Sequence, residues 1–164
     1  MVFTGLKYGW EPGQLMMGGA EDGARTALQS EATALIVPGV FVAAVPAQAE
    51  NLERRGVILP AAIESIIVGV SMAFLPNLRE VDGYPPKTQI AYYWKGQVGI
   101  WVIADVKAND PVYSFFNPTN PAQKGFAGNV AGATASLVPG VRFLSSTTGS
   151  PATPGVALVS LNLP

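Results

Sequence analysis

The chain has 164 residues, enough for one domain with a real core, and carries a formal net charge of −1 with no basic block. Binding to nucleic acid needs clustered lysine and arginine, so the charge argues against that partner. Cysteine and histidine are both absent, which excludes disulfides and thiolate metal sites and removes the commonest general base. Charged residues make up only 13%, so we expect much of the surface to lie against other protein.

Glycine occurs 18 times and proline 14 times, which strand-and-loop folds tolerate better than helices do. The longest apolar windows, residues 32–47 and 66–75, are too short or too interrupted by proline to span a bilayer. The first residues also lack the apolar core of a signal peptide. The composition therefore predicts an all-β protein, a small antiparallel barrel or sandwich with long loops rich in proline and glycine, and no membrane partner.

Residues 1–34 are predicted to form an extended N-terminal arm, and residues 35–164 the β body. The arm is rich in glycine but also carries large apolar residues, which a disordered tail is expected to lack. We expect it to order against another subunit, since aromatic and methionine side chains outside a core are often interface residues. The predicted interface residues are Phe3, Tyr8, Trp10, Leu15, Met16 and Met17. A mobile terminus is the alternative, and residues 21–30 could form one or two helical turns.

Residues 35–42 are predicted to form two short strands separated by a break at Pro38 and Gly39, and further strands are predicted at residues 57–59 and 66–74. A helix beginning at Pro60 is the competing interpretation for the start of the third segment, but Gly69 and the density of isoleucine and valine favour a strand from Ile66 onward.

Residues 88–116 read as three strands and two turns, rich in β-branched and aromatic residues, and are predicted to be the central β core. Residues 117–135 are irregular, and Phe126 is their one large apolar residue. Either neighbours pack against this loop or it is mobile at a tip, and Phe126 joins the predicted interface residues. Strands at 141–145 and 156–163 complete a total of roughly seven to nine, the count of a small barrel or sandwich.

The tetrapeptide Val-Pro-Gly-Val occurs at residues 37–40 and again at 138–141, each time before a predicted strand. We interpret the recurrence as reuse of a good strand-entry turn, with internal duplication as the alternative.

No group of residues in the sequence predicts catalysis. Asp105 and Asp110 could form a glycosidase pair, or a calcium site with Asn109, but aspartates in turns normally bond the local backbone. Without histidine no ordinary triad is possible, and no phosphate-binding loop is present. We therefore predict no enzymatic activity, no metal and no cofactor. A sugar platform built from Tyr92, Tyr93, Trp94 and Trp101 is weighed against packing of these aromatics in a core or interface, which is commoner.

Several motifs occur together in a recognisable order: GQVGIWVIADVKANDPVYSFF, then GFAG, LVPGVRFLSSTTG and a closing GVALVSLNLP. In this arrangement, over residues 35–163, the chain resembles the capsid cement (decoration) proteins of tailed phages. In that family a turn introduces a strand of the type here found at residues 109–113, a later strand matches residues 139–144, and a further strand closes the sheet. IVPGVFV and IIVGVSMAF in the first half fit the same pattern.

The resemblance implies a structural protein that sits on the outer face of the virion capsid after synthesis in the host cytoplasm. It implies binding to the major capsid protein, commonly as a homotrimer, to tie neighbouring subunits together. Low charge and an anchored arm suit this role. The alternatives are a carbohydrate-binding or adhesive β module, and another virion component such as a tail or head-completion protein.

Overall fold

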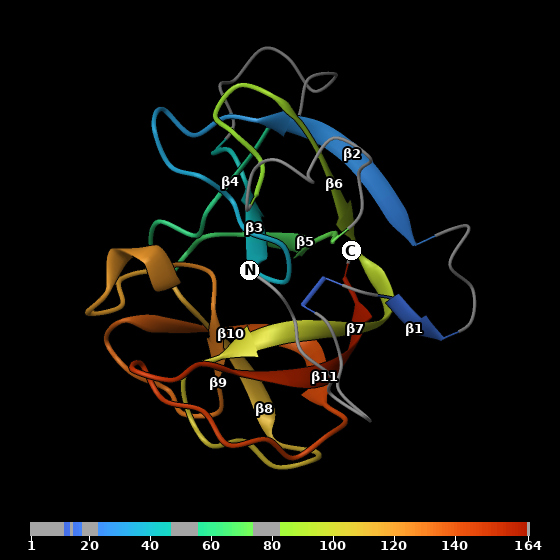
Figure 1. Ribbon diagram of the computed structural model, residues 1–164, viewed down its shortest axis with the longest axis vertical. Helices are drawn as coiled ribbons and strands as arrows, with labels where there is room; N and C mark the ends of the chain where they lie inside the picture. The colour runs from blue at the N-terminus through green and yellow to red at the C-terminus, as the bar shows by residue number, and fades with distance from the viewer. Residues whose placement is uncertain (1–11, 14, 18–22, 47–55, 74–82, 164) are drawn as a thin grey trace.

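The computed structural model describes residues 12–13, 15–17, 23–46, 56–73 and 83–163 (Figure 1). This part of the chain contains one short 3-10 helix, η2 (Pro121–Gln123), and eleven strands, so the all-β prediction is confirmed. The strands are β1 (Leu15–Met17), β2 (Ala24–Gln29), β3 (Phe41–Ala44), β4 (Gly56–Ile58), β5 (Ile67–Ser71), β6 (Gln89–Tyr93), β7 (Lys95–Val102), β8 (Pro111–Phe115), β9 (Ala127–Gly128), β10 (Ala135–Phe143) and β11 (Gly155–Asn162).

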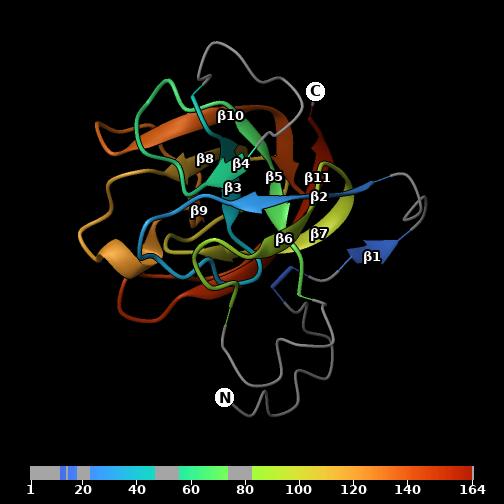
Figure 2. The same cartoon turned by 90° about the horizontal axis from the view of Figure 1, so that it is seen from above.

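The strands form two small barrels. The first closes in the order β2-β4-β3-β5-β6, and the second in the order β7-β11-β10-β8-β9 through the pairing of β9 with β7. Each barrel contains one parallel pair, β2 with β4 and β7 with β9, and all other neighbours are antiparallel. Seen from above, the first barrel lies over the second (Figure 2). The sequence predicted a barrel or sandwich, but not that there are two barrels with mixed pairing.

The segment at residues 88–116 forms three strands as predicted, β6, β7 and β8. It is not one core, however, because β6 closes the first barrel whereas β7 and β8 belong to the second. Only Trp94 separates β6 from β7. The segment is therefore the junction between the barrels, and alternation along a strand does not reveal which strand it will pair with.

Strand β2 replaces the helical turns considered for residues 21–30. It pairs antiparallel with β6 over residues 24–28, and its last residue, Gln29, is fully buried. The Gln29 Nε2 donates to the Ala34 carbonyl at 2.8 Å, and its Oε1 accepts the Glu31 N–H at 3.0 Å. Strand pairing thus begins at residues that the sequence assigned to the arm, before the predicted boundary at residue 35. Residues 1–11 lie outside the described part of the chain.

Residues 12–13 and 15–17 connect the two barrels. Gly13 N–H donates to the Gly99 carbonyl on β7 at 2.7 Å, and the Gly13 carbonyl accepts the N–H of Ala73, which follows β5, at 2.9 Å. Strand β1 then continues along β7, with Leu15 opposite Val98. The backbone of this segment therefore bonds to the second barrel on one side and to the first on the other.

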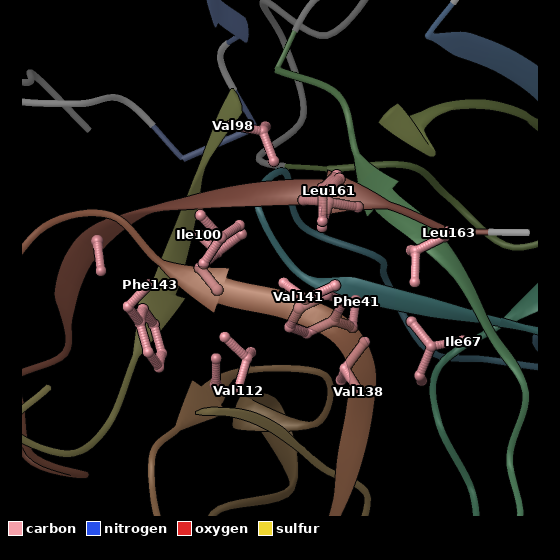
Figure 3. Packing of buried hydrophobic residues seen from close by; sticks show 14 of the residues in the cluster. Phe41, Ile67, Val98, Ile100, Val112, Val138, Val141, Phe143, Leu161 and Leu163 are labelled. Atoms are coloured by element: carbon pink, nitrogen blue, oxygen red, sulfur yellow. The ribbon is translucent and has the colours of Figure 1, made fainter. Parts of the chain in front are cut away.

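The buried apolar residues form two clusters, and one of these clusters contains residues of both barrels. Strand β3 is buried on both faces, with Val42 in the interior of the first barrel and Phe41 among residues of the second. Figure 3 shows Phe41 beside Val138 and Val141 of β10. This packing joins the two barrels into one body.

Polar contacts reinforce the seam between the barrels. The Trp101 Nε1–H donates to the Pro38 carbonyl at 3.1 Å, and the Trp101 backbone N–H to Gly39 at 3.0 Å. The Trp101 ring stacks on Phe126, with ring centroids 5.9 Å apart. Because Trp101 belongs to the second barrel and Pro38–Gly39 to the first, these bonds fix the relative position of the barrels.

Tyr84 provides a pH-dependent contribution to stability. It is 1% exposed, its hydroxyl donates to the Met72 carbonyl at 3.0 Å, and burial raises its pKa from 10.0 to about 12. Above pH 10 the unfolded chain loses this proton while the folded protein keeps it, so stability is full below pH 10 and is lost as the pH rises through 12. We expect a loss of about 2 kcal/mol from Tyr84 between pH 9 and pH 12.

The measurement is urea unfolding at pH 9, 11 and 12, with Tyr84→Phe as the comparison. The variant starts about 1 kcal/mol less stable because a buried hydrogen bond is gone, but its stability should fall less across this range. Equal pH dependence in the two proteins would show that Tyr84 is not responsible.

Candidate functional site

The two aspartates considered for catalysis hold turns together. The Asp105 Oδ1 accepts the Gly149 N–H at 3.1 Å, and the Asp110 Oδ2 accepts the Asn129 Nδ2–H at 2.6 Å and the Lys107 N–H at 2.9 Å. The bond from Asn129, followed by that from Lys107, lowers the pKa of Asp110. Within the described ranges no group of three or more carboxylates gathers as a metal site would require. These hydrogen bonds give Asp105 and Asp110 a structural role in holding the turns.

The four aromatic residues considered for a sugar platform do not share an exposed face. Tyr92 and Tyr93 are 7% and 9% exposed and point to opposite sides of β6. The Arg25 guanidinium covers the Trp94 ring at 4.4 Å, and Trp101 lies in the seam between the barrels. These aromatics serve packing, the commoner of the two interpretations.

Large apolar side chains are exposed at several other places on the described surface. The most exposed are Val130 at 68%, Ile66 at 67% and Ile63 at 63%, all in connections between strands. Leu28, Leu35, Leu137 and Leu144 are exposed to between 38% and 52%. Exposed aliphatic side chains on a surface poor in charge are typical of a protein that binds other protein.

The predicted interface residues fall into three groups. Phe3, Tyr8 and Trp10 lie outside the described residues. Leu15, Met16 and Met17 form β1, whose backbone pairs with β7. Phe126 is 8% exposed and stacks on Trp101, so its ring packs inside this chain.

Comparison with known proteins identifies the family of the chain. The sequence model of a phage family described as "Structural cement protein (E217 gp24/Pam3 gp6)" matches residues 6–162. The chain belongs to the phage structural cement protein family. The match spans both barrels and confirms the resemblance seen in the sequence motifs. This cement protein is a structural component of the virion capsid and not an enzyme.

A solved structure shares the fold of the cement protein. A chain of "The capsid of Myoviridae Phage XM1" aligns with a TM-score of 0.62 at 19% sequence identity, and the alignment covers 98% of this chain and 94% of that one. No curated protein sequence matches the chain. In the described part of the cement protein, no helix has the length and hydropathy to cross a membrane.

The exposed apolar residues of the cement protein were missed in the sequence. Ile63 and Ile66 merge into the apolar run that becomes β5, and Val130 stands alone among small residues. The signal in the sequence is Ser65, whose hydroxyl accepts the N–H groups of Ala61 and Ala62 in a turn before the strand. For Val130 the sequence contains no comparable signal.

Proposed function

We propose that this cement protein binds the outer face of an assembled viral head and stabilises it by bridging neighbouring major capsid subunits. The observation that carries the proposal is the family match over residues 6–162. Two barrels packed into one body supply a stiff connector, and the surface poor in charge supplies the contact area. A protein that binds the assembled shell more tightly than free subunits stabilises the shell by mass action.

The proposed partners are the major capsid protein and further copies of this chain, as a homotrimer. The arm contributes Phe3, Tyr8 and Trp10, which bury against a capsid subunit or a sister copy, with residues 15–17 next to them in the chain. Support comes from the hydrogen bonds of Gly13, which attach the end of this segment to both barrels. Repetition over the symmetric shell adds avidity, so each contact can be weak.

The homotrimer is tested by light scattering at protein concentrations at which heads are decorated. A monomer at those concentrations would contradict the trimer.

Heads purified without the cement protein are expected to break at a lower temperature than decorated heads, and adding the protein should restore the difference. Deleting residues 1–11 should weaken head binding by on the order of 100-fold, because the anchoring side chains and their avidity are lost. The deletion stops before Pro12 so that β1, β2 and the bonds of Gly13 stay intact. Co-sedimentation with heads measures binding, and light scattering during heating measures shell stability.

The matched control replaces residues 1–11 with a glycine and serine segment of equal length, which should bind as poorly as the deletion. If the wild-type protein binds heads without raising their breaking temperature, the cement mechanism is wrong. If the truncated protein binds normally, only the role of the arm is wrong. Near-ultraviolet circular dichroism verifies that both variants are folded.

A further inference from the structure

The two barrels repeat the same strand arrangement. In each, the first strand pairs in parallel with the third, and the remaining neighbours, third with second, second with fourth, fourth with fifth and fifth with first, are antiparallel. Strands β2 to β6 therefore correspond one to one, and in chain order, with strands β7 to β11.

A detail outside the strands repeats as well. Ile36 and Tyr84 form an isolated antiparallel bridge in the first barrel, with N–H to carbonyl distances of 3.1 and 2.8 Å. Val106 and Thr147 form the matching bridge in the second, at 2.9 and 3.0 Å. Both bridges join the connection after the first strand to the connection after the fourth.

The turn after each bridge is also equivalent. Gly39, with φ of +79°, and Asn109, with φ of +73°, both stand three residues after the bridge and two before the next strand. The structural counterpart of Val-Pro-Gly-Val at 37–40 is therefore residues 107–110. The second copy of the tetrapeptide, at 138–141, lies inside β10 and is not equivalent. The strand arrangement repeats in the fold, although the repeated tetrapeptide does not mark equivalent positions of the repeat.

The exposed apolar residues follow this repeat. We define the first tip as residues 59–66 and the second tip as residues 129–134, the connections from the third to the fourth strand of each barrel. The three most exposed large apolar side chains of the described residues, Ile63, Ile66 and Val130, all lie in these tips. The tips contain a single charged residue, Glu64.

Local hydrogen bonds hold each tip in shape. In the first tip the Ser65 hydroxyl accepts the N–H groups of Ala61 and Ala62, both at 3.0 Å. In the second, Asn129 is bound to Asp110 at 2.6 Å. The apolar side chains are thus presented from ordered turns, which reduces the conformational entropy lost on binding.

We propose that the two tips are two copies of one docking element, and that each binds the same apolar surface on one of two neighbouring major capsid subunits. The inference rests on the proposed function. A shell built from one subunit offers the same surface on adjacent copies, and a duplicated binder offers two equivalent tips to match. Because the tips are almost uncharged and display isoleucine and valine, the matching surface is apolar. The bridge across subunits is then built into one chain.

Charged substitutions test the two tips separately. The variants are Ile63→Glu with Ile66→Glu for the first tip, Val130→Glu for the second, and both sets together. The control is Thr119→Glu, at an exposed polar residue in the connection between β8 and η2. Against heads purified without the cement protein, each single-tip set is expected to weaken binding by on the order of 100-fold, because one of two linked contacts is lost. The combined set should not decorate heads, and the control should bind within about threefold of wild type.

The outcomes separate this inference from the proposed function. If wild-type protein does not bind heads, the proposed function fails. If wild type binds and the tip variants bind equally well, the proposed function stands and the tips are not the docking elements. If only one tip variant weakens head binding, the proposal that both tips bind capsid subunits is wrong. If the tip variants decorate heads normally but light scattering shows altered self-association, the tips bind a second copy of this chain, and the proposal is also wrong. Serine variants at the same residues should weaken binding in the same order, and circular dichroism verifies folding.

Discussion

Replacing Gly39 with alanine is expected to lower the free energy of unfolding by about 3 kcal/mol. Gly39 has φ of +79°, a region that a residue with a Cβ enters at a cost. The added Cβ would also lie 2.7 Å from the Pro12 Cα and 2.8 Å from the Gly13 nitrogen. Both neighbours are backbone atoms in the segment that bonds to the two barrels, so they cannot move aside without breaking those bonds.

The chain supplies its own control in Gly140. It has the same Val-Pro-Gly-Val neighbours and a φ of +76°, but the nearest atom to an added Cβ is the Asn162 carbonyl oxygen at 3.8 Å. Gly140→Ala should therefore cost about 1 kcal/mol, from the backbone conformation alone. Urea unfolding of the two variants measures the difference. Equal losses would mean that Pro12 and Gly13 do not pack against Gly39 as described.

The identical tetrapeptides show what a local sequence can and cannot specify. Both copies predict a turn with a glycine at positive φ, and both glycines have it. One copy enters β3 at the seam between the barrels, and the other is an irregularity within β10. The difference comes from strands far away in the sequence, and turn chemistry carries no information about them.

The same limit explains how much of the fold was predictable. Residues 88–116 were predicted to form three strands, and β6, β7 and β8 form there, with β7 bonded along its length to β11. The division into two barrels depends on β6 and β7 pairing with different strands although they are adjacent in the chain. The local sequence does not distinguish this arrangement from a hairpin in which β6 and β7 pair with each other.

The interface predictions show that the sequence also does not reveal which apolar residue of a loop is exposed. Phe126 was assigned to an interface because it is a large apolar residue in an irregular segment, but Trp101 covers it within the chain. Val130, close to it in sequence, is exposed. A side chain is buried or exposed according to distant packing, so the apolar content of a loop predicts an interface without identifying which residue forms it.

Replacing Phe41 with alanine is expected to cost about 4 kcal/mol, in the range for a buried phenylalanine. The side chain is fully buried, and although β3 belongs to the first barrel, Phe41 packs in the cluster built mainly from the second (Figure 3). The cavity left behind would lie at the seam, between residues such as Ile67 of β5 and Val141 of β10. The substitution should therefore weaken the attachment between the barrels as well as the core of either one.

The measurement is urea unfolding followed by both near- and far-ultraviolet circular dichroism, with Leu144→Ala, at a residue 39% exposed, as the control. The control should change stability by less than about 1 kcal/mol. In wild type the two signals should coincide in one transition, since one apolar cluster contains residues of both barrels. In Phe41→Ala the midpoint of the transition should move to a lower urea concentration. If any variant shows the two barrels unfolding separately, it should be this one. Two resolved transitions in the wild-type protein would contradict the shared core, because each barrel would then be stable without the other.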